Sequence, residues 1–234
     1  MHQKIQRGAN QVLPSPRASG QSSSLSPTQM RPNGPATKGI ILMKRLALVT
    51  GILALAAPMA LAQYSTWASD PAHSEVDFSI IHGGVSNVHG RFGNVAATLV
   101  YNEADVTKST VTATIDVGTV NTGVTGRDSD LASDRFFEVA KYPTATFTST
   151  NVAKNGNKLT VSGNFTVHGV TKPVVLDVVG PSTPVEGMKD HKAHSGFTAT
   201  TTISRTVFGI GTSVPPAMVG DDVKLTIELE IIKQ

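Results

Sequence analysis

The sequence predicts an all-β domain of eight antiparallel strands with one short helix. Apolar and polar residues alternate with a period of two in segment after segment beyond residue 72, which is typical of strands with one buried face. Short turns with hairpin residues separate these segments. Only one stretch, residues 126–150, interrupts the alternation, and it does so with a cluster of charged residues.

Each predicted strand places its apolar side chains on one face. Two strands are expected at residues 95–101 and 144–152, and six other segments show the alternation most clearly. The inward-facing residues of these six are Val76, Phe78 and Ile80; Val111, Ala113, Ile115 and Val117; Leu159, Val161, Phe165 and Val167; Val174, Leu176 and Val178; Phe197, Ala199, Thr201 and Ile203; and Leu225, Ile227, Leu229 and Ile231.

The connections between these strands indicate an antiparallel meander. Asn155 and Gly156 form the strongest short hairpin signal, and Gly169 lies in a second short turn at residues 168–173. Eight such strands either close into a barrel, which is just wide enough for one small ligand, or stack as a sandwich with a solid core. Alternation alone does not choose between the two.

The segment that interrupts the alternation predicts a short helix. Thr125, followed by Asp128 three residues later, fits an N-terminal capping pattern, and the residues beyond suit a helix that ends near Phe137. Tyr142 and Pro143 then restart the extended chain, because proline disfavours helix in the residue before it. We expect this helix between strands four and five, over the mouth of a barrel.

The charges of this segment have two interpretations. Its carboxylates could supply an acid and base pair; they are Asp128, Asp130, Asp134 and Glu138. A spacing of four residues, however, places the last three on one helix face near Arg127 and Arg135, which is typical of a solvated surface. We therefore expect residues 127–137 to turn Leu131, Phe136 and Phe137 inward and the charges outward.

The first 62 residues are expected to lie outside the folded domain. Residues 1–42 are polar and lack apolar periodicity, which indicates a disordered or mis-assigned upstream segment. Residues 43–62 have the basic start, apolar run and small-x-small end of a signal peptide, with cleavage expected after Ala62. A membrane anchor is the alternative, but the run is short and contains Pro58. Residues 63–234 then form a single domain.

Removing this leader reverses the sign of the net charge. Of the 20 Lys and Arg, seven lie before residue 63, and none of the 17 Asp and Glu does, which leaves 13 basic residues, 17 acidic residues and a net charge of −4. A nucleic-acid-binding role is therefore excluded. The chain has no cysteine, which excludes thiol nucleophiles, cysteine-bound zinc, iron–sulfur clusters and covalently attached haem.

Histidines are the strongest candidates for reactive chemistry. The mature chain contains no G-x-S-x-G, S-x-x-K, H-E-x-x-H or G-x-x-x-x-G-K-[ST] motif. His73, His82 and His89 lie on or beside the first two long strands, and His191 and His194 flank a loop, where they could share a metal ion. No definite third ligand accompanies them, so solvated histidines are favoured. A metal-assisted hydrolase or isomerase is the alternative function.

Five segments together carry a resemblance to a known family. They are "DPAHSEVDFSIIHGGVSNVHGRF", "TGRDSDLASDRFFEVAKYPTATFTST", "VSGNFTVHGVTKPVVLDV", "ISRTVFGI" and "VGDDVKLTIELEI". The chain resembles the YceI-like family of secreted lipid-binding proteins over nearly its whole mature length. This resemblance implies a lipocalin-like, extended eight-stranded antiparallel β-barrel whose tunnel holds a polyisoprenoid chain, such as a quinone tail, in the bacterial periplasm.

The chain departs from the family at one position of the charged segment. Where the family commonly has R-D-x-H-L, this sequence has Arg127, Asp128, Ser129, Asp130 and Leu131. A head-group role of the histidine is therefore not carried over to Asp130.

The function that the resemblance implies is that of a lipid carrier or buffer, with a link to stress and no reaction of its own. The expected ligand-binding residues are Phe78, Ile80, Phe92, Ala113, Ile115, Leu131, Phe136, Phe137, Phe147, Phe165, Val167 and Phe197. No catalytic residue, metal or cofactor besides the lipid is expected. Expected partners are the isoprenoid lipid or quinone, a membrane or membrane redox protein in transient contact, and a second copy in a homodimer.

A third hypothesis is a stress-related interaction protein whose barrel is filled by its own side chains. In that case Phe78, Phe147, Phe165 and Phe197 would converge and leave no continuous void. Small residues on the expected inner faces favour an open tunnel instead; they are Ala113, Gly163, Ala199 and Thr201.

Overall fold

The computed structural model describes residues 64–234, and the expectations for residues 1–42, the signal peptide and its cleavage site lie outside these residues. The strands are β1 (Tyr64–Ser69), β2 (Glu75–His82), β3 (Ser86–Phe92), β4 (Val95–Asn102), β5 (Thr110–Asp116), β6 (Thr144–Asn155), β7 (Lys158–Val167), β8 (Val170–Val179), β9 (Val185–Glu186), β10 (Ala193–Ser204) and β11 (Val219–Lys233). The helices are α1 (Thr125–Ala132) and the short 3-10 turns η1 (Val106–Lys108), η2 (Val117–Thr119) and η3 (Thr206–Phe208). Among these residues no helix is long and apolar enough to cross a membrane.

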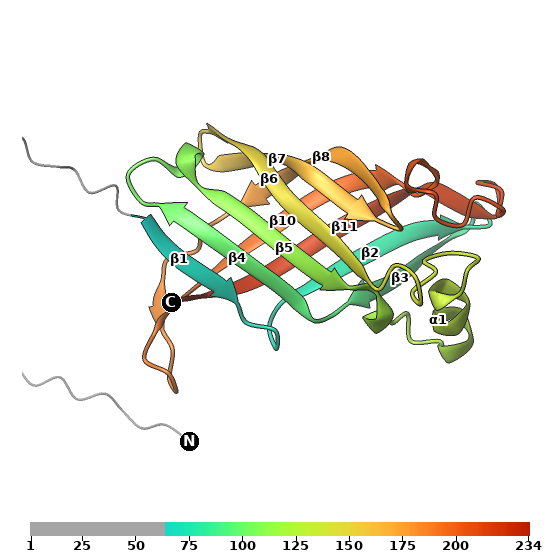
Figure 1. Cartoon of the computed structure of the whole chain (residues 1–234), viewed down its shortest axis with the longest axis horizontal. Helices are drawn as coiled ribbons and strands as arrows, with labels where there is room; N and C mark the ends of the chain where they lie inside the picture. Colours follow the sequence, from blue (N-terminus) through green and yellow to red (C-terminus); the bar gives the residue numbers. More distant parts are fainter. Residues whose placement is uncertain (1–63) are drawn as a thin grey trace, which may run out of the picture. The chain divides into compact units, whose positions relative to one another are not determined.

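Eight antiparallel strands close into a barrel (Figure 1). Neighbours around the wall follow the order β11, β1, β4, β5, β6, β7, β8 and β10, and pairing of β10 with β11 closes the ring. This last pairing runs from His194 opposite Ile232 to Ser204 opposite Asp222. The predicted barrel is confirmed, and the sandwich alternative is wrong because this long-range pairing joins the two edges that a sandwich would leave open.

One wall of the barrel is built from interrupted strands. The 15-residue β11 pairs with β2 near its start and with β1 near its end, and the turn of residues 70–74 separates β1 from β2. A second interruption separates β3, which pairs with β2, from β4, which pairs with β1. Gly93 and Asn94 lie between these two strands, and Asn94 has a φ of 52°. The eight predicted strands did not include β1, β3 or the two-residue β9.

The segment after η2 covers the free edge of β3. Arg91 and Asn121 exchange two backbone hydrogen bonds, with N···O distances of 2.9 and 3.0 Å. This isolated bridge places the chain that leads into α1 against the barrel wall. The helix therefore lies at one end of the barrel, while β9 and the C-terminus lie at the opposite end (Figure 1).

Helix α1 lies between β5 and β6, the third and fourth of the eight predicted strands rather than the fourth and fifth, and it is shorter than predicted. It ends at Ala132 rather than near Phe137, because Ser133 is extended and its hydroxyl donates to the carbonyl of Asp130 at 2.6 Å. The predicted cap is also wrong: Thr125 lies inside the helix, whose N-cap is Val124 without a side-chain hydrogen bond. Asp128 instead accepts hydrogen bonds from the backbone N–H and hydroxyl of Thr122.

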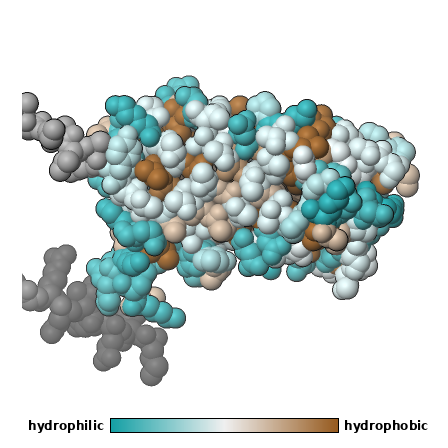
Figure 2. Space-filling view, in the orientation of Figure 1, coloured by the Kyte–Doolittle hydropathy of each residue, from teal (hydrophilic) through white to brown (hydrophobic). Residues whose placement is uncertain are grey.

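Two glycines make room for aromatic rings against the inner wall. A Cβ at Gly90 would collide with the ring of Phe78, and a Cβ at Gly163 would collide with the ring of Phe147. Both rings therefore lie close against the backbone of a neighbouring strand instead of standing upright in the lumen. On the face shown in Figure 2, the surface is mainly polar or neutral with scattered apolar residues.

Candidate functional site

The candidate site is a cavity of about 240 Å³ inside the barrel. Side chains from nine strands line it, together with residues after α1 and around η3. Along β11 the lining extends from Val219 to Ile231, twelve residue steps or ~40 Å of strand. The cavity is therefore long and narrow, and its walls are the inner faces of the strands.

The lining of this cavity is almost wholly apolar. Within residues 64–234, its polar side chains belong to Tyr101, Ser109, Thr110, Thr201 and Arg205, and no Asp, Glu, His or Lys contributes to it. Among the described residues, the phenol of Tyr101 is the one lining group of a type used in general acid and base chemistry, and no carboxylate, imidazole or amine accompanies it in the lining. Its physical character suits a ligand that is itself apolar.

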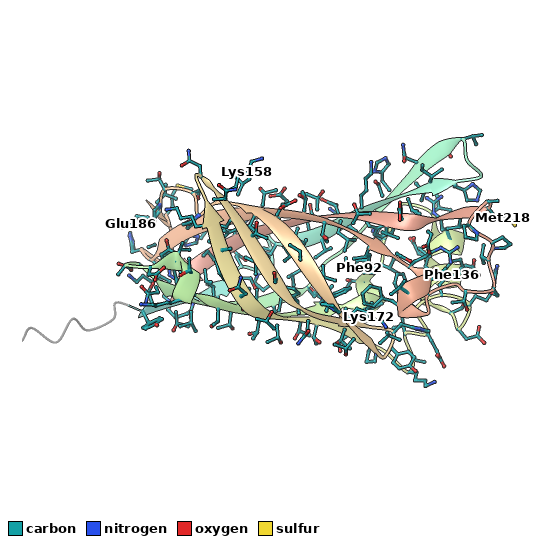
Figure 3. All side chains as sticks on the ribbon, turned by 90° about the horizontal axis from the view of Figure 1, so that it is seen from above. Phe92, Phe136, Lys158, Lys172, Glu186 and Met218 are labelled. Carbon is teal, nitrogen blue, oxygen red and sulfur yellow. The ribbon has the colours of Figure 1, made fainter. Side chains whose placement is uncertain are left out.

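All twelve residues expected to bind a ligand line the cavity. They are Phe78, Ile80, Phe92, Ala113, Ile115, Leu131, Phe136, Phe137, Phe147, Phe165, Val167 and Phe197. Figure 3 shows Phe92 and Phe136 inside the barrel, at the end that carries Met218 and opposite the end that carries Glu186. Their role in ligand binding stays a prediction, but the structure brings all of them to one continuous surface.

The aromatic side chains do not converge into one plug. Phe78 belongs to a buried cluster near α1, Phe147 belongs to a second cluster, and Phe165 packs against both. Phe197 packs against the second cluster. The cavity contacts residues of both clusters, whereas the filled-barrel hypothesis requires four converging rings and no continuous void.

The segment around α1 closes one end of the cavity with apolar residues. Leu131, Phe136 and Phe137 face the cavity, and the ring of Phe137 meets that of Phe92 edge-on at 5.5 Å between centroids. Asp130 and Arg135 form an exposed ion pair at 2.7 Å. The charged cluster is therefore a rim outside the cavity, and Asp130 is not among the residues that line it.

Arg205 is the charged residue that sequence reasoning missed. It is 2% exposed and borders the cavity. Its guanidinium donates five hydrogen bonds to backbone carbonyls, those of Ile210, Gly211, Val214, Val219 and Gly220, at 2.6–3.0 Å. Burial lowers the pKa of Arg205, and the nearby Asp221 carboxylate opposes this change. Because all five donors are used, this cation joins the loop after η3 to the start of β11 and has none left for a ligand.

Sequence reasoning also left the inner face of residues 95–101 unassigned. Val95, Ala97, Leu99 and Tyr101 all line the cavity. Their period of two was a signal that could have found them.

The candidate metal-binding histidines lie away from this cavity. His82 and His89 are exposed on β2 and β3. His191 and His194 do not share a site, since His191 Nδ1 contacts Glu186 and His194 bonds Glu230 and Asp190. The alternative that these two histidines share one ion has no support in this arrangement, because His191, in the turn between β9 and β10, and His194, on β10, contact different carboxylates.

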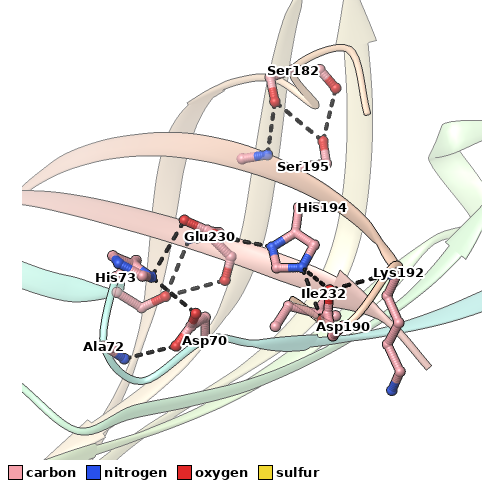
Figure 4. Close-up of polar contacts among 12 residues, drawn as sticks. Asp70, Ala72, His73, Ser182, Asp190, Lys192, His194, Ser195, Glu230 and Ile232 are labelled. Atoms are coloured by element: carbon pink, nitrogen blue, oxygen red, sulfur yellow. Dashed lines mark hydrogen bonds and ion pairs between the residues drawn. The ribbon is translucent and has the colours of Figure 1, made fainter. Parts of the chain in front are cut away.

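His73 and His194 meet at the carboxylate of Glu230 instead (Figure 4). His194 Nδ1 lies 2.7 Å from Glu230 Oε1, and His73 Nδ1 lies 3.6 Å from Glu230 Oε2. His73 Nδ1 also lies 2.9 Å from Asp70 Oδ2. The hydrogen bond to Asp70 raises the pKa of His73, and those to Glu230 and Asp190 raise the pKa of His194.

Comparison with known proteins assigns this barrel to a family. The YceI-like domain family matches residues 67–231. The protein belongs to the YceI-like family. It is 36% identical over 197 residues to the UPF0312 protein of Pectobacterium atrosepticum, covering 83% of this chain and all of that protein.

Two solved structures share the fold. The crystal structure of Burkholderia cenocepacia BcnA is similar with a TM-score of 0.60 and 25% identity, covering 69% of this chain and 98% of BcnA. A polyisoprenoid binding domain from Saccharophagus degradans, implicated in plant cell wall breakdown, has a TM-score of 0.54 and 18% identity, covering 73% of this chain and 99% of that domain. The predicted family and the predicted barrel are thus confirmed.

Proposed function

We propose that this YceI-like protein holds the apolar tail of a polyisoprenoid lipid, such as a quinone, inside its barrel. It acts as a periplasmic carrier or buffer, with a role in stress and no reaction of its own. The observation that carries this proposal is the lining of the cavity. In the described part of the chain its one charged side chain, Arg205, donates all of its hydrogen bonds to backbone carbonyls. On such a surface, a longer apolar ligand buries more apolar area and binds more tightly, and no charged group is free to pair with a ligand.

The energetics favour a ligand that stays bound. Each buried methylene contributes about 0.8 kcal/mol, so several isoprene units nominally exceed the roughly −18 to −21 kcal/mol at which measured affinities saturate. Ordering the flexible chain offsets most of this gain. The remaining affinity is enough for the lipid to persist through purification.

A related structure and residues 43–62 bear on two parts of the proposal, the polyisoprenoid ligand and the periplasmic location. The Saccharophagus degradans domain is described as polyisoprenoid binding, although at 18% identity its likeness speaks for the fold alone. The signal-like residues 43–62 support a periplasmic location. Loading and unloading would require transient contact with a membrane or a membrane redox protein, and a homodimer would let two tunnels join.

Extraction of the purified mature protein with organic solvent, followed by mass spectrometry, tests this proposal. We expect a long-chain isoprenoid lipid at close to one molecule per barrel. A matched extraction of an unrelated exported protein of the same host controls for carried-over membrane lipid. Recovery of no long-chain lipid from repeated preparations, or of the same lipids from both proteins, would overturn the proposal.

A further inference from the structure

A second cluster of polar groups lies on the outside of the barrel. Asp70 and His73 belong to the turn between β1 and β2, and Glu230 belongs to β11. The backbone fixes this turn against β11: Asp70 N–H donates to the carbonyl of Glu230 at 2.8 Å, and the Ser74 hydroxyl donates to the same carbonyl at 3.2 Å. Residues 160 positions apart in the sequence are therefore held in a set position before any ligand binds.

The donor atoms of these residues converge. His73 Nδ1 lies 2.9 Å from Asp70 Oδ2 and 3.6 Å from Glu230 Oε2, and one ligand atom from each of the three lies within 4.8 Å of the others. Ligands of a tetrahedral zinc ion, each 2.0–2.2 Å from the metal, are about 3.3–3.6 Å apart. We propose that Asp70, His73 and Glu230 bind a zinc ion on the outer wall of the barrel.

A second layer of side chains orients the Glu230 ligand. While Oε2 of Glu230 faces His73, its Oε1 pairs with His194 Nδ1 at 2.7 Å. His194 Nε2 in turn lies 3.0 Å from Asp190 Oδ2 (Figure 4). Outer partners of this kind hold metal ligands in place and strengthen binding. His194 is thus a positioning residue, 16% exposed in its side chain, and not a ligand.

The composition of the cluster selects the kind of ion. One imidazole and two carboxylates suit zinc, whereas calcium and magnesium prefer oxygen ligands alone. Three protein ligands leave one position for water. The site adds a fixed link between the β1–β2 turn, β11 and, through His194 and Asp190, the β9–β10 hairpin.

This zinc site is separate from the proposed lipid site. Leu229 and Ile231 line the cavity, and side chains alternate along a strand, so Glu230 projects from the opposite face of the wall. The ion and the lipid would occupy opposite sides of β11. The two proposals can therefore fail independently: zinc titration tests the outer cluster, and lipid extraction tests the cavity.

Calorimetric titration of the chelator-treated protein with zinc chloride tests the proposal. We expect one zinc ion per chain, with affinity lowered at least about tenfold in His73→Ala and in Glu230→Gln. His194→Ala, which removes an outer partner, should lower affinity about 10- to 100-fold and keep the stoichiometry of one. Cobalt(II) bound in place of zinc should give the visible absorption of a tetrahedral site, and this spectrum should be lost in His73→Ala.

Two controls separate the site from surface binding. His89→Ala removes an exposed histidine of β3 and should leave zinc affinity unchanged. His73→Ala should leave the extracted lipid unchanged, because the residue does not line the cavity. If the wild type binds no zinc, or if His73→Ala and the wild type bind it equally, the proposal is wrong. His73 lies in a turn with a 64% exposed side chain, so this variant is expected to fold even if Glu230→Gln does not.

Discussion

Asp221 stabilises the tight turn that positions Arg205. Its carboxylate accepts hydrogen bonds from the Ser204 hydroxyl, and from the backbone N–H and hydroxyl of Thr206, at 2.5–3.0 Å. The bonds from Ser204 and Thr206 are the main reason that the pKa of Asp221 lies below its ordinary value of 3.8. A carboxyl with a lowered folded-state pKa stabilises the protein above its unfolded pKa and loses this effect as the pH falls through the folded value.

Asp221→Asn is therefore expected to destabilise the protein at pH 7 by about 1 kcal/mol, the net value of such hydrogen bonds. The difference from the wild type should begin to shrink as the pH falls below 3.8, and it should be lost below the lower pKa of the folded carboxyl, where the wild-type side chain is itself protonated. Urea unfolding at a series of pH values measures this difference. Asp222→Asn, a change at the exposed neighbour, is the control, and an Asp221→Asn effect that stays constant down to the lowest pH would contradict the explanation.

At single residues, the sequence pattern predicts which side chains face the interior, but it does not predict contacts between distant segments. The expected ligand-binding residues that lie on strands line the cavity because alternation decides which face of a strand is buried. The role of Arg205 had no such signal, since its partners are backbone carbonyls, and any residue supplies those. His73 and Glu230 are likewise brought together by pairing of strands from the two ends of the domain, which a local pattern does not contain.

At the scale of elements, the α1 segment joins an apolar inner edge to a charged outer edge. The start of this helix is fixed by Arg127 and Asp128, whose side chains both hydrogen-bond Thr122. Sequence reasoning placed the apolar residues on the correct side but extended the helix too far. The chain leaves the helix at Ser133 and reaches a left-handed conformation at Glu138, with a φ of 48°, and such a conformation is not evident from residue pattern.

We expect the apolar residues of this segment that line the cavity, Leu131, Phe136 and Phe137, to retain the lipid, and the exposed charges to contribute little. Phe137→Asp would place an unpaired charge at the cavity, which is costly, and we expect lipid loading to fall at least about tenfold, a factor that corresponds to only about 1.4 kcal/mol. Asp130→Asn and Asp134→Asn should leave loading nearly unchanged, because exposed ion pairs contribute little. Mass spectrometry after identical purification compares the three variants. If the two Asn variants empty the barrel and Phe137→Asp does not, the faces are wrongly assigned.

At the scale of the whole molecule, closure of the barrel is what turns an apolar face into a tunnel. The sequence predicted the faces and the antiparallel order, but closure depends on the pairing of β10 with β11 and on β1 and β2 sharing one side of β11. Both are long-range choices between edges of similar character, so alternation could not decide them. The resemblance to a family supplied that decision.

The length of the tunnel should set the length of the lipid that it holds, and Ala199 allows a test. This residue is 7% exposed and lines the cavity between strands β8 and β11. A phenylalanine there would project into the lumen and leave the wall in place. Because the ring enters existing space, we expect a stability loss below the roughly 1–3 kcal/mol of an overpacked core.

Lipid extracted from Ala199→Phe should therefore be lower in amount or shorter in chain than lipid from the wild type. The matched control is Thr200→Phe, which adds the same ring to the next residue of β10, whose side chain is exposed and points away from the lumen because side chains alternate along the strand. Thr200→Phe should retain the wild-type lipid. If both variants carry the wild-type lipid in full, the chain does not pass Ala199, and the ligand occupies only the part of the cavity near α1.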